Sequence, residues 1–181
     1  MIAFIDFGPR ASEMSGLPIF HRNHLSDLRA RGLRRVHLAL PELRLQIEAA
    51  EEVQGIGLDV VSAIHPTAVV SPQAHLGRNI YLGPLAIVGP EAHLGDFCRI
   101  LNGASVAHHS RLGRGVRVSD GARIAGHVTV GENTLLGLGA TVNFHLSIGR
   151  DVVIVSGASV YDSVPDHHTV RIDGNAYARG A

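Results

Sequence analysis

An aliphatic side chain stands at every sixth position from Ile64 to Val160, with no break in the spacing. A second phase, four residues after each of these anchors, carries mostly small residues such as Ala68, Ala86 and Ala104. Neither an α-helix nor an alternating β-strand has a period of six. A chain that turns at the same place in every unit does have this period, and glycine often follows the anchor, where the backbone bends. The sequence therefore predicts a hexapeptide-repeat solenoid of short parallel strands with nearly six coils.

Residues 1–63 do not share this repeat. Strand-like segments at 2–5, 35–40 and 58–63 alternate with helix-like segments at 24–30 and 41–54, and 8–16 has the composition of a loop. This βαβαβ order is typical of a small parallel sheet. We therefore expect a small α/β domain of partial Rossmann type over residues 1–63. A β-helix should follow over 64–165, and a C-terminal cap or tail over 166–181.

The composition excludes several classes of function. The formal net charge is zero and the pI is about 7.2, so a nucleic-acid or membrane-surface partner is not expected. No apolar run approaches the ~18 residues of a membrane-spanning helix, and no signal peptide is recognisable, which predicts a cytoplasmic protein. The only cysteine, Cys98, lies in the small inward phase and should be a buried structural thiol. All basic residues are arginine, which leaves no lysine nucleophile.

The repeat also predicts which residues lie above one another. If three hexapeptides form one triangular coil, residues 18 apart stack at the ~4.8 Å spacing of a β-sheet. His109, His127 and His145 should then form one column, with Glu91 below it and Ser163 above it. A second column should contain His75 and His93, followed by Arg111. The triple column is either a solvated or interface-lining stack, or an edge that handles protons or binds metal, because histidine titrates near neutral pH.

Two sequence features together resemble a known family. The repeat itself resembles the left-handed parallel β-helix superfamily, most of whose enzymes are acyltransferases. The junction Ala63-Ile64-His65-Pro66-Thr67-Ala68 is similar to the I-H-P-S-A junction of the sialic-acid O-acetyltransferase and nucleotide-amino-sugar N-acetyltransferase family, the NeuD/PglD/PerB group. The catalytic stretch of that family, N-x-G-A-x-V-x-H, resembles the segment from Asn102 to His108. The resemblance covers nearly the whole chain and implies a mostly-β, left-handed β-helix preceded by a truncated α/β domain.

The resemblance also implies site residues. His108 would be the general base, and His109 stands where the family usually has Glu or Asp. Asp96 and Asp120 are candidates for supplying the missing carboxylate, and His109 is the second candidate catalytic residue. The family's contacts to acetyl-CoA map to four positions of this chain: Arg117, Gly126, Leu138 and Ser156. The family usually has His at the first of these positions and Gly at the last.

The N-terminal region departs most from the family. Relatives open with a strand and a glycine-rich loop, followed by about twenty further residues, and this chain begins at the later strand, which carries Asp6 and Phe7. Those two residues are the candidate acceptor-binding residues. Pro41 stands in a loop where the family has a glycine-containing segment, and it removes a backbone donor there.

We expect direct transfer of an acetyl group from acetyl-CoA, as co-substrate, to an amine or hydroxyl of a sugar or nucleotide-sugar-like acceptor. Neutral His108 would accept the acceptor's proton, and backbone N–H groups such as that of Gly126 would stabilise the oxyanion. The resemblance implies a homotrimer with acetyl-CoA between adjacent solenoids, and no metal is expected. The sequence leaves open which acceptor is used and whether nitrogen or oxygen is acetylated.

Two alternatives of other classes remain at this point. One is a zinc enzyme of the carbonic-anhydrase type, a left-handed β-helix trimer whose intersubunit histidines would here be His109 and His145. Arg150, however, occupies the place where that site would have a further histidine. The other alternative is a non-catalytic or degenerate β-helix subunit of a larger assembly.

Overall fold

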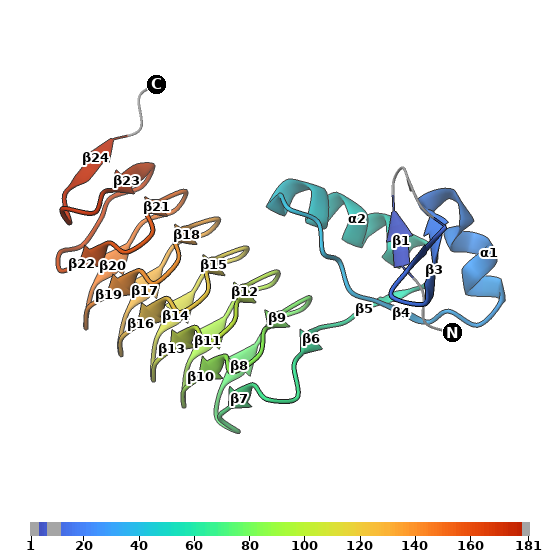
Figure 1. The fold of residues 1–181 in the computed structure, drawn as a ribbon, viewed down its shortest axis with the longest axis horizontal. Coiled ribbons are helices and arrows are strands. Elements are labelled where there is room, and N and C mark those ends of the chain that lie inside the picture. The colour runs from blue at the N-terminus through green and yellow to red at the C-terminus, as the bar shows by residue number, and fades with distance from the viewer. Residues whose placement is uncertain (1–3, 7–11, 179–181) are drawn as a thin grey trace. The chain divides into compact units, whose positions relative to one another are not determined.

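The computed structural model describes residues 4–6 and 12–178, and the chain divides into two compact units, Met1–Val61 and Ser62–Ala181. The first unit contains two small sheets and two α-helices (Figure 1). Its elements are β1 (Phe4–Asp6), β2 (Glu13–Met14), β3 (Leu17–His21), a 3-10 turn η1 (Arg22–His24), α1 (Leu25–Ala30), β4 (Arg35–Val36), α2 (Leu43–Gly55) and β5 (Asp59–Val60). Leu25, Val53 and Leu58 form its buried core.

The first unit differs from the sequence-based expectation in its strand pairing. β1 pairs in parallel with β3, a strand that was not predicted, and β3 pairs antiparallel with β2, inside the segment expected to be a loop. Proline is unfavourable inside a strand, because it has no backbone N–H to donate. Pro18 lies opposite Glu13 in a pairing of only two residues, so the missing hydrogen bond costs little here. α2 begins at Leu43, after Glu42 in extended conformation, so Pro41 precedes the helix instead of opening it. β4 and β5 form a separate parallel pair.

The second unit is a left-handed parallel β-helix whose three faces are stacks of strands of two or three residues (Figure 1). The first face contains β6 (Ala63–Ile64), β9 (Tyr81–Leu82), β12 (Arg99–Ile100), β15 (Arg117–Val118), β18 (Leu135–Leu136), β21 (Val153–Ile154), β23 (His168–Val170) and β24 (Ala176–Ala178). The second face contains β7 (Val69–Val70), β10 (Ile87–Val88), β13 (Ser105–Val106), β16 (Arg123–Ile124), β19 (Thr141–Val142) and β22 (Ser159–Val160). The third face contains β8 (His75–Leu76), β11 (His93–Leu94), β14 (Arg111–Leu112), β17 (Thr129–Val130) and β20 (Ser147–Ile148).

The strand register confirms that three hexapeptides make one coil. Val88 pairs with Val106, and His75 pairs with His93, each 18 residues further along the chain. The last coil is two residues shorter, because Ile148 pairs with Val164 and Val153 with Thr169.

This shortening changes two of the predicted positions. Val164 lies level with the anchor Ile148 and not in the small inward phase where the repeat placed it. The hydroxyl of Ser163 accepts a hydrogen bond of 3.0 Å from the Ser147 N–H, so Ser163 lies beside Ser147 and does not continue the column above His145.

The interior of the prism is apolar except for a few polar side chains that bridge successive coils. Anchors such as Ile100 and Leu136 are fully buried. The buried hydroxyl of Ser110 donates to the Ala125 carbonyl at 2.8 Å and accepts from the Val128 N–H at 3.2 Å. Thr134 lies one and a third coils further along the chain and makes the same two kinds of bond. Its hydroxyl donates to the Gly149 carbonyl and accepts from the Val152 N–H. Every such buried group is therefore satisfied, and Ser110 ties the coil that carries His108 to the next coil.

Within the described part of the chain, no helix has both the length and the apolar character needed to cross a membrane.

Candidate active site

The corner between the second and third faces carries four histidines from three successive coils. His109, His127 and His145 each occupy the left-handed backbone region, with φ of 59°, 59° and 61°. The His127 N–H donates to the His108 carbonyl at 3.1 Å, which fixes one coil against the next. Because the turn has the same conformation in each coil, the side chains leave the corner in the same direction.

The four imidazoles form a defined cluster. The ring centroids of His109 and His127 are 4.8 Å apart with an interplanar angle of 21°, and those of His127 and His145 are 4.8 Å apart at 7°. The predicted column is therefore confirmed. His108 stands nearly perpendicular to it, with its centroid 5.3 Å from His109 and 5.2 Å from His127. His127 lies between His109 and His145, so those two rings do not face each other.

His108 and His109 share one hydrogen bond. Their Nδ1 atoms are 3.2 Å apart, so one ring donates and the other accepts. If His108 donates from Nδ1, its Nε2 carries a free lone pair and is able to accept a proton. If His109 donates, Nε2 of His108 carries the hydrogen and cannot act as a base. Only the first tautomer would allow His108 to act as a general base, and His109 is the group that can fix it through this bond.

The two carboxylates considered as partners of His108 lie at other corners of the prism. Asp96 lies at the corner between the third and first faces, where its carboxylate binds the Arg78 guanidinium at 3.0 Å. Asp120 lies at the turn between the first and second faces. His109 is therefore the titratable partner that the structure gives to His108.

Gly126 lies directly against the His108 ring. A Cβ atom placed on Gly126 would lie 2.6 Å from Cε1 and 2.8 Å from Nε2 of His108, which is closer than van der Waals contact allows. The absent side chain therefore leaves the space that the imidazole occupies. The family resemblance implied a contact of Gly126 with acetyl-CoA, and its backbone N–H was expected to stabilise the oxyanion; only the packing of the two coils reveals its contact with His108.

The other predicted site residues lie elsewhere on the chain. Leu138 and Ser156 meet at the corner between the first and second faces, where the Leu138 N–H donates to the Ser156 hydroxyl at 3.2 Å. Arg117 lies on the first face beside Arg99. Asp6 is exposed on β1 in the other unit, and Phe7 lies outside the described residues. The structure thus brings together His108, His109 and Gly126, while one side of the prism, roughly 20 Å of extended chain, separates them from Leu138 and Ser156.

Covalent catalysis by cysteine has no support in the structure. Cys98 is fully buried, as predicted, and its thiol donates to the Gly113 carbonyl at 3.1 Å. Burial raises the pKa of Cys98 to about 12, so the thiolate is not populated near neutral pH.

The histidine column makes stability depend on pH. Desolvation, and then the neighbouring imidazoles, lower the pKa of His127 below its ordinary value of 6.5. Above pH 6.5, His127 is neutral in both the folded and the unfolded chain. Below it, the unfolded chain takes up the proton more readily, so folded stability is lost as the pH falls. We expect the melting temperature to fall between pH 7.5 and 5.5, and to fall less in His127→Gln.

Thermal unfolding at several pH values across this range tests the expectation. His24→Gln, which removes a histidine from the other unit, should keep the wild-type profile. Superimposable profiles for wild type and His127→Gln would show that the column is solvated and has no energetic coupling to folding.

Comparisons with known proteins relate this chain to acetyltransferases of solved structure. No protein-family model matches the sequence, and no curated protein matches it. The X-ray structure of PerB from Caulobacter crescentus, in complex with CoA and GDP-perosamine, is 32% identical to this chain with a TM-score of 0.85. The match covers 93% of this chain and 82% of PerB.

Two further solved structures are similar over almost the entire chain. One is a variant of the perosamine N-acetyltransferase of Caulobacter crescentus in which a histidine is replaced by asparagine, also with CoA and GDP-perosamine. It is 31% identical, with a TM-score of 0.90 over 99% of this chain and 85% of that one. The other is the acetyltransferase domain of PglB from Neisseria gonorrhoeae with acetyl coenzyme A. It is 25% identical, with a TM-score of 0.88 over 98% of this chain and 85% of that one.

Proposed function

Because the chain belongs to the hexapeptide-repeat family of nucleotide-amino-sugar N-acetyltransferases, we propose that it transfers the acetyl group of acetyl-CoA to the amine of a nucleotide-linked amino sugar. Acetyl-CoA is the co-substrate, and CoA is bound in PerB and in its histidine variant. GDP-perosamine, the nucleotide sugar bound in those structures, represents the chemical class of acceptor that we propose here. A role in cytoplasmic sugar biosynthesis is part of this proposal.

His108 is the proposed general base. Its Nε2 accepts a proton from the acceptor amine as the nitrogen attacks the thioester carbonyl. The new C–N bond forms, the C–S bond breaks, and the proton on His108 passes to the departing CoA thiolate. The observation that carries this assignment is the 3.2 Å contact between the Nδ1 atoms of His108 and His109, which leaves Nε2 of His108 free in the productive tautomer.

Neighbouring groups are proposed to support this step. His109 accepts the Nδ1–H of His108 and thereby fixes both the tautomer and the orientation of the ring. The Gly126 backbone, in contact with the same ring, is the proposed source of an N–H for the oxyanion that develops on the thioester carbonyl. This arrangement needs neither a covalent acyl-enzyme nor a carboxylate next to His108.

We further propose that the active site is shared between copies in a homotrimer. His108 and Gly126 lie at one corner of the prism, and Leu138 and Ser156 at another, with a full face between them. In such a trimer, the corner with His108 and Gly126 in one protomer faces the corner with Leu138 and Ser156 in its neighbour, and one acetyl-CoA molecule contacts both. Leu138 is 56% exposed in the single chain, which supports a partner at that corner.

Acetyl-CoA binding and transfer test the proposal. Calorimetry should detect acetyl-CoA binding, and a panel of nucleotide-linked amino sugars that includes GDP-perosamine should release CoA thiol in the presence of enzyme. Light scattering on the same preparation should give the mass of three chains. Folded protein that does not bind acetyl-CoA would overturn the proposed reaction and favour a non-catalytic subunit, and a stable monomer would overturn the shared site.

A further inference from the structure

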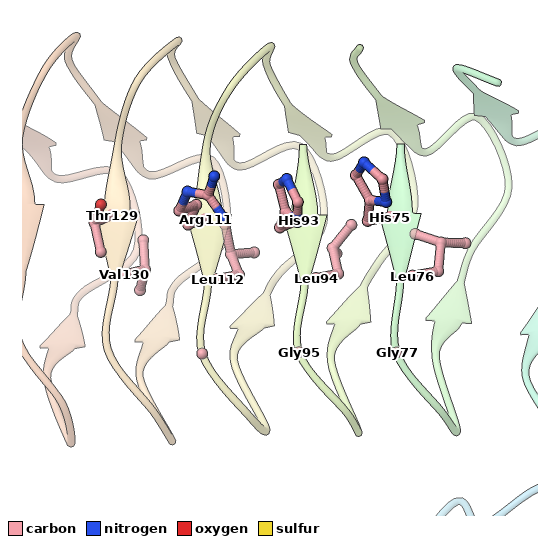
Figure 2. A pocket seen from close by; sticks show the side chains of 11 residues that line it. His75, Leu76, Gly77, His93, Leu94, Gly95, Arg111, Leu112, Thr129 and Val130 are labelled. Atoms are coloured by element: carbon pink, nitrogen blue, oxygen red, sulfur yellow. The ribbon is translucent and has the colours of Figure 1, made fainter. Parts of the chain in front are cut away.

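The third face of the β-helix carries a second histidine cluster on its strands β8 and β11, beside the corner that holds His108. His75, His93, Arg111 and Thr129 occupy successive strands and form a row along a groove of about 520 Å³ (Figure 2). His75 pairs in register with His93, and His93 with Arg111, so the row follows from the 18-residue coil.

A carboxylate joins the two histidines of this groove. Glu91 lies at the corner just before β11, where its backbone is left-handed with φ of 56°. Its carboxylate and the ring nitrogens of His75 and His93 all lie within 4.8 Å of one another. The two imidazoles are stacked, with centroids 4.2 Å apart and an interplanar angle of 16°. The position 18 residues before His109 thus contributes to this cluster and not to the His109 column.

We propose that His75, Glu91 and His93 bind a divalent transition-metal ion, with Zn²⁺ as the best match. Two imidazoles and one carboxylate are a common zinc ligand set, and they leave a fourth position open for water or a ligand in the groove. Calcium and magnesium prefer oxygen ligands and suit this set less well. The site shares no ligand with the proposed acetyl-transfer centre, and Glu91 lies one coil before His109 at the same corner.

The ligand atoms of His75, Glu91 and His93 can reach a common ion by side-chain movement alone. Ligand atoms bound tetrahedrally at about 2.0–2.1 Å lie roughly 3.3 Å apart, so separations of up to 4.8 Å shorten by about 1.5 Å at most. The two stacked rings must turn out of their parallel arrangement, because the in-plane nitrogen lone pairs of parallel imidazoles do not point at one ion. His75 is exposed and the other two side chains are half-buried, which leaves room for this rotation. The backbone stays fixed, because the N–H groups of His75 and His93 donate to the adjacent coil at 2.8 Å.

Two charged side chains, Arg111 and Glu91, lie beside the imidazoles of this cluster. Arg111 continues the row beside His93, because the two residues pair in register on adjacent strands. The positive charge of Arg111 disfavours the binding of a cation, and the negative charge of Glu91 offsets this effect. The only other such group among the described residues, His108, His109 and His127, lacks a carboxylate to supply this charge.

Metal titration of the dialysed full-length chain tests the site. Calorimetry with Zn²⁺ should show one tightly bound equivalent, and Co²⁺ should give the visible absorption of a low-coordinate site. Loss of a second-shell partner typically weakens metal binding by about 10–100-fold, so His93→Gln and Glu91→Gln should each weaken Zn²⁺ binding at least that much. His127→Gln, the same substitution in the other cluster, is the matched control and should bind Zn²⁺ like wild type.

Circular dichroism of each variant separates loss of the site from loss of the fold. Binding that survives in folded His93→Gln but disappears in His127→Gln would assign the ion to the His108 corner and overturn the proposal. Wild-type protein that binds no stoichiometric Zn²⁺ would also overturn it, whatever the result of the acetyl-transfer assay.

Discussion

Replacing His108 by alanine is expected to lower the rate constant of acetyl transfer by about 10²–10⁴-fold, because the acceptor amine then loses its general base. Acetyl-CoA binding should remain nearly intact, since the ring is proposed to contact the proton being transferred. The protein should stay folded, as His108 lies at an exposed corner outside the buried core. Rapid-quench or thiol-release kinetics, together with calorimetric titration of acetyl-CoA, measure the two effects separately.

His145→Ala is the matched control for this experiment. It removes one ring from the same corner, but His145 stacks on His127 and has no ring contact with His108 among the described residues. Its activity should remain close to that of wild type. If His108→Ala retained activity while His109→Ala lost it, the base would be His109 and the assigned direction of the shared hydrogen bond would be reversed.

Gly126→Ala is expected to lower the rate constant by about 10²-fold with little effect on the melting temperature. The added Cβ would overlap Cε1 and Nε2 of His108, so the imidazole must turn away from its position. A displacement of about 1 Å at a catalytic group is enough for a loss of this size. Because the displaced group is a side chain at an exposed corner, the backbone of the coil need not move.

A second glycine provides the opposite behaviour. Gly121 has φ of +66° and open space around its Cα, so Gly121→Ala strains the backbone without contacting His108. It should lose about 1–2 kcal/mol of stability and keep its activity. Gly126→Ala should thus have the lower activity of the two variants, and Gly121→Ala the lower melting temperature. Unchanged activity in Gly126→Ala would show that the ring does not need its present position, and acetyl-CoA binding weakened in proportion to rate would move the effect to cofactor binding.

The repeat made much of the solenoid predictable, because each coil is fixed by short-range spacing. An aliphatic residue at every sixth position determines which side chains point inward, and the pairing of residues 18 apart follows. The stacking of His109, His127 and His145 could be deduced from their positions alone, and the ring distances confirm it. The shortening after Val160 could not, because Val164 also fits the continuing pattern.

The details of the candidate site depend on side-chain rotation and on packing between coils. The spacing placed His108 beside the column, but its perpendicular ring and its contact with Gly126 depend on torsion angles that no periodicity encodes. The spacing also placed Glu91 beneath His109, whereas its carboxylate turns toward His75 and His93. In the first unit, β3 was not expected, because its short pairings with β1 and β2 leave no periodic pattern in the sequence.

The 18-residue coil also limits how a gene of this kind can change in length. Duplicating one whole coil would add one member to every column and keep each residue type on its own corner. Inserting six or twelve residues would rotate all following residues by one or two faces and carry His127 and His145 away from His108. Selection should therefore accept repeat gains before Val160 only in multiples of 18, while the final coil, already two residues shorter, lies beyond that restriction.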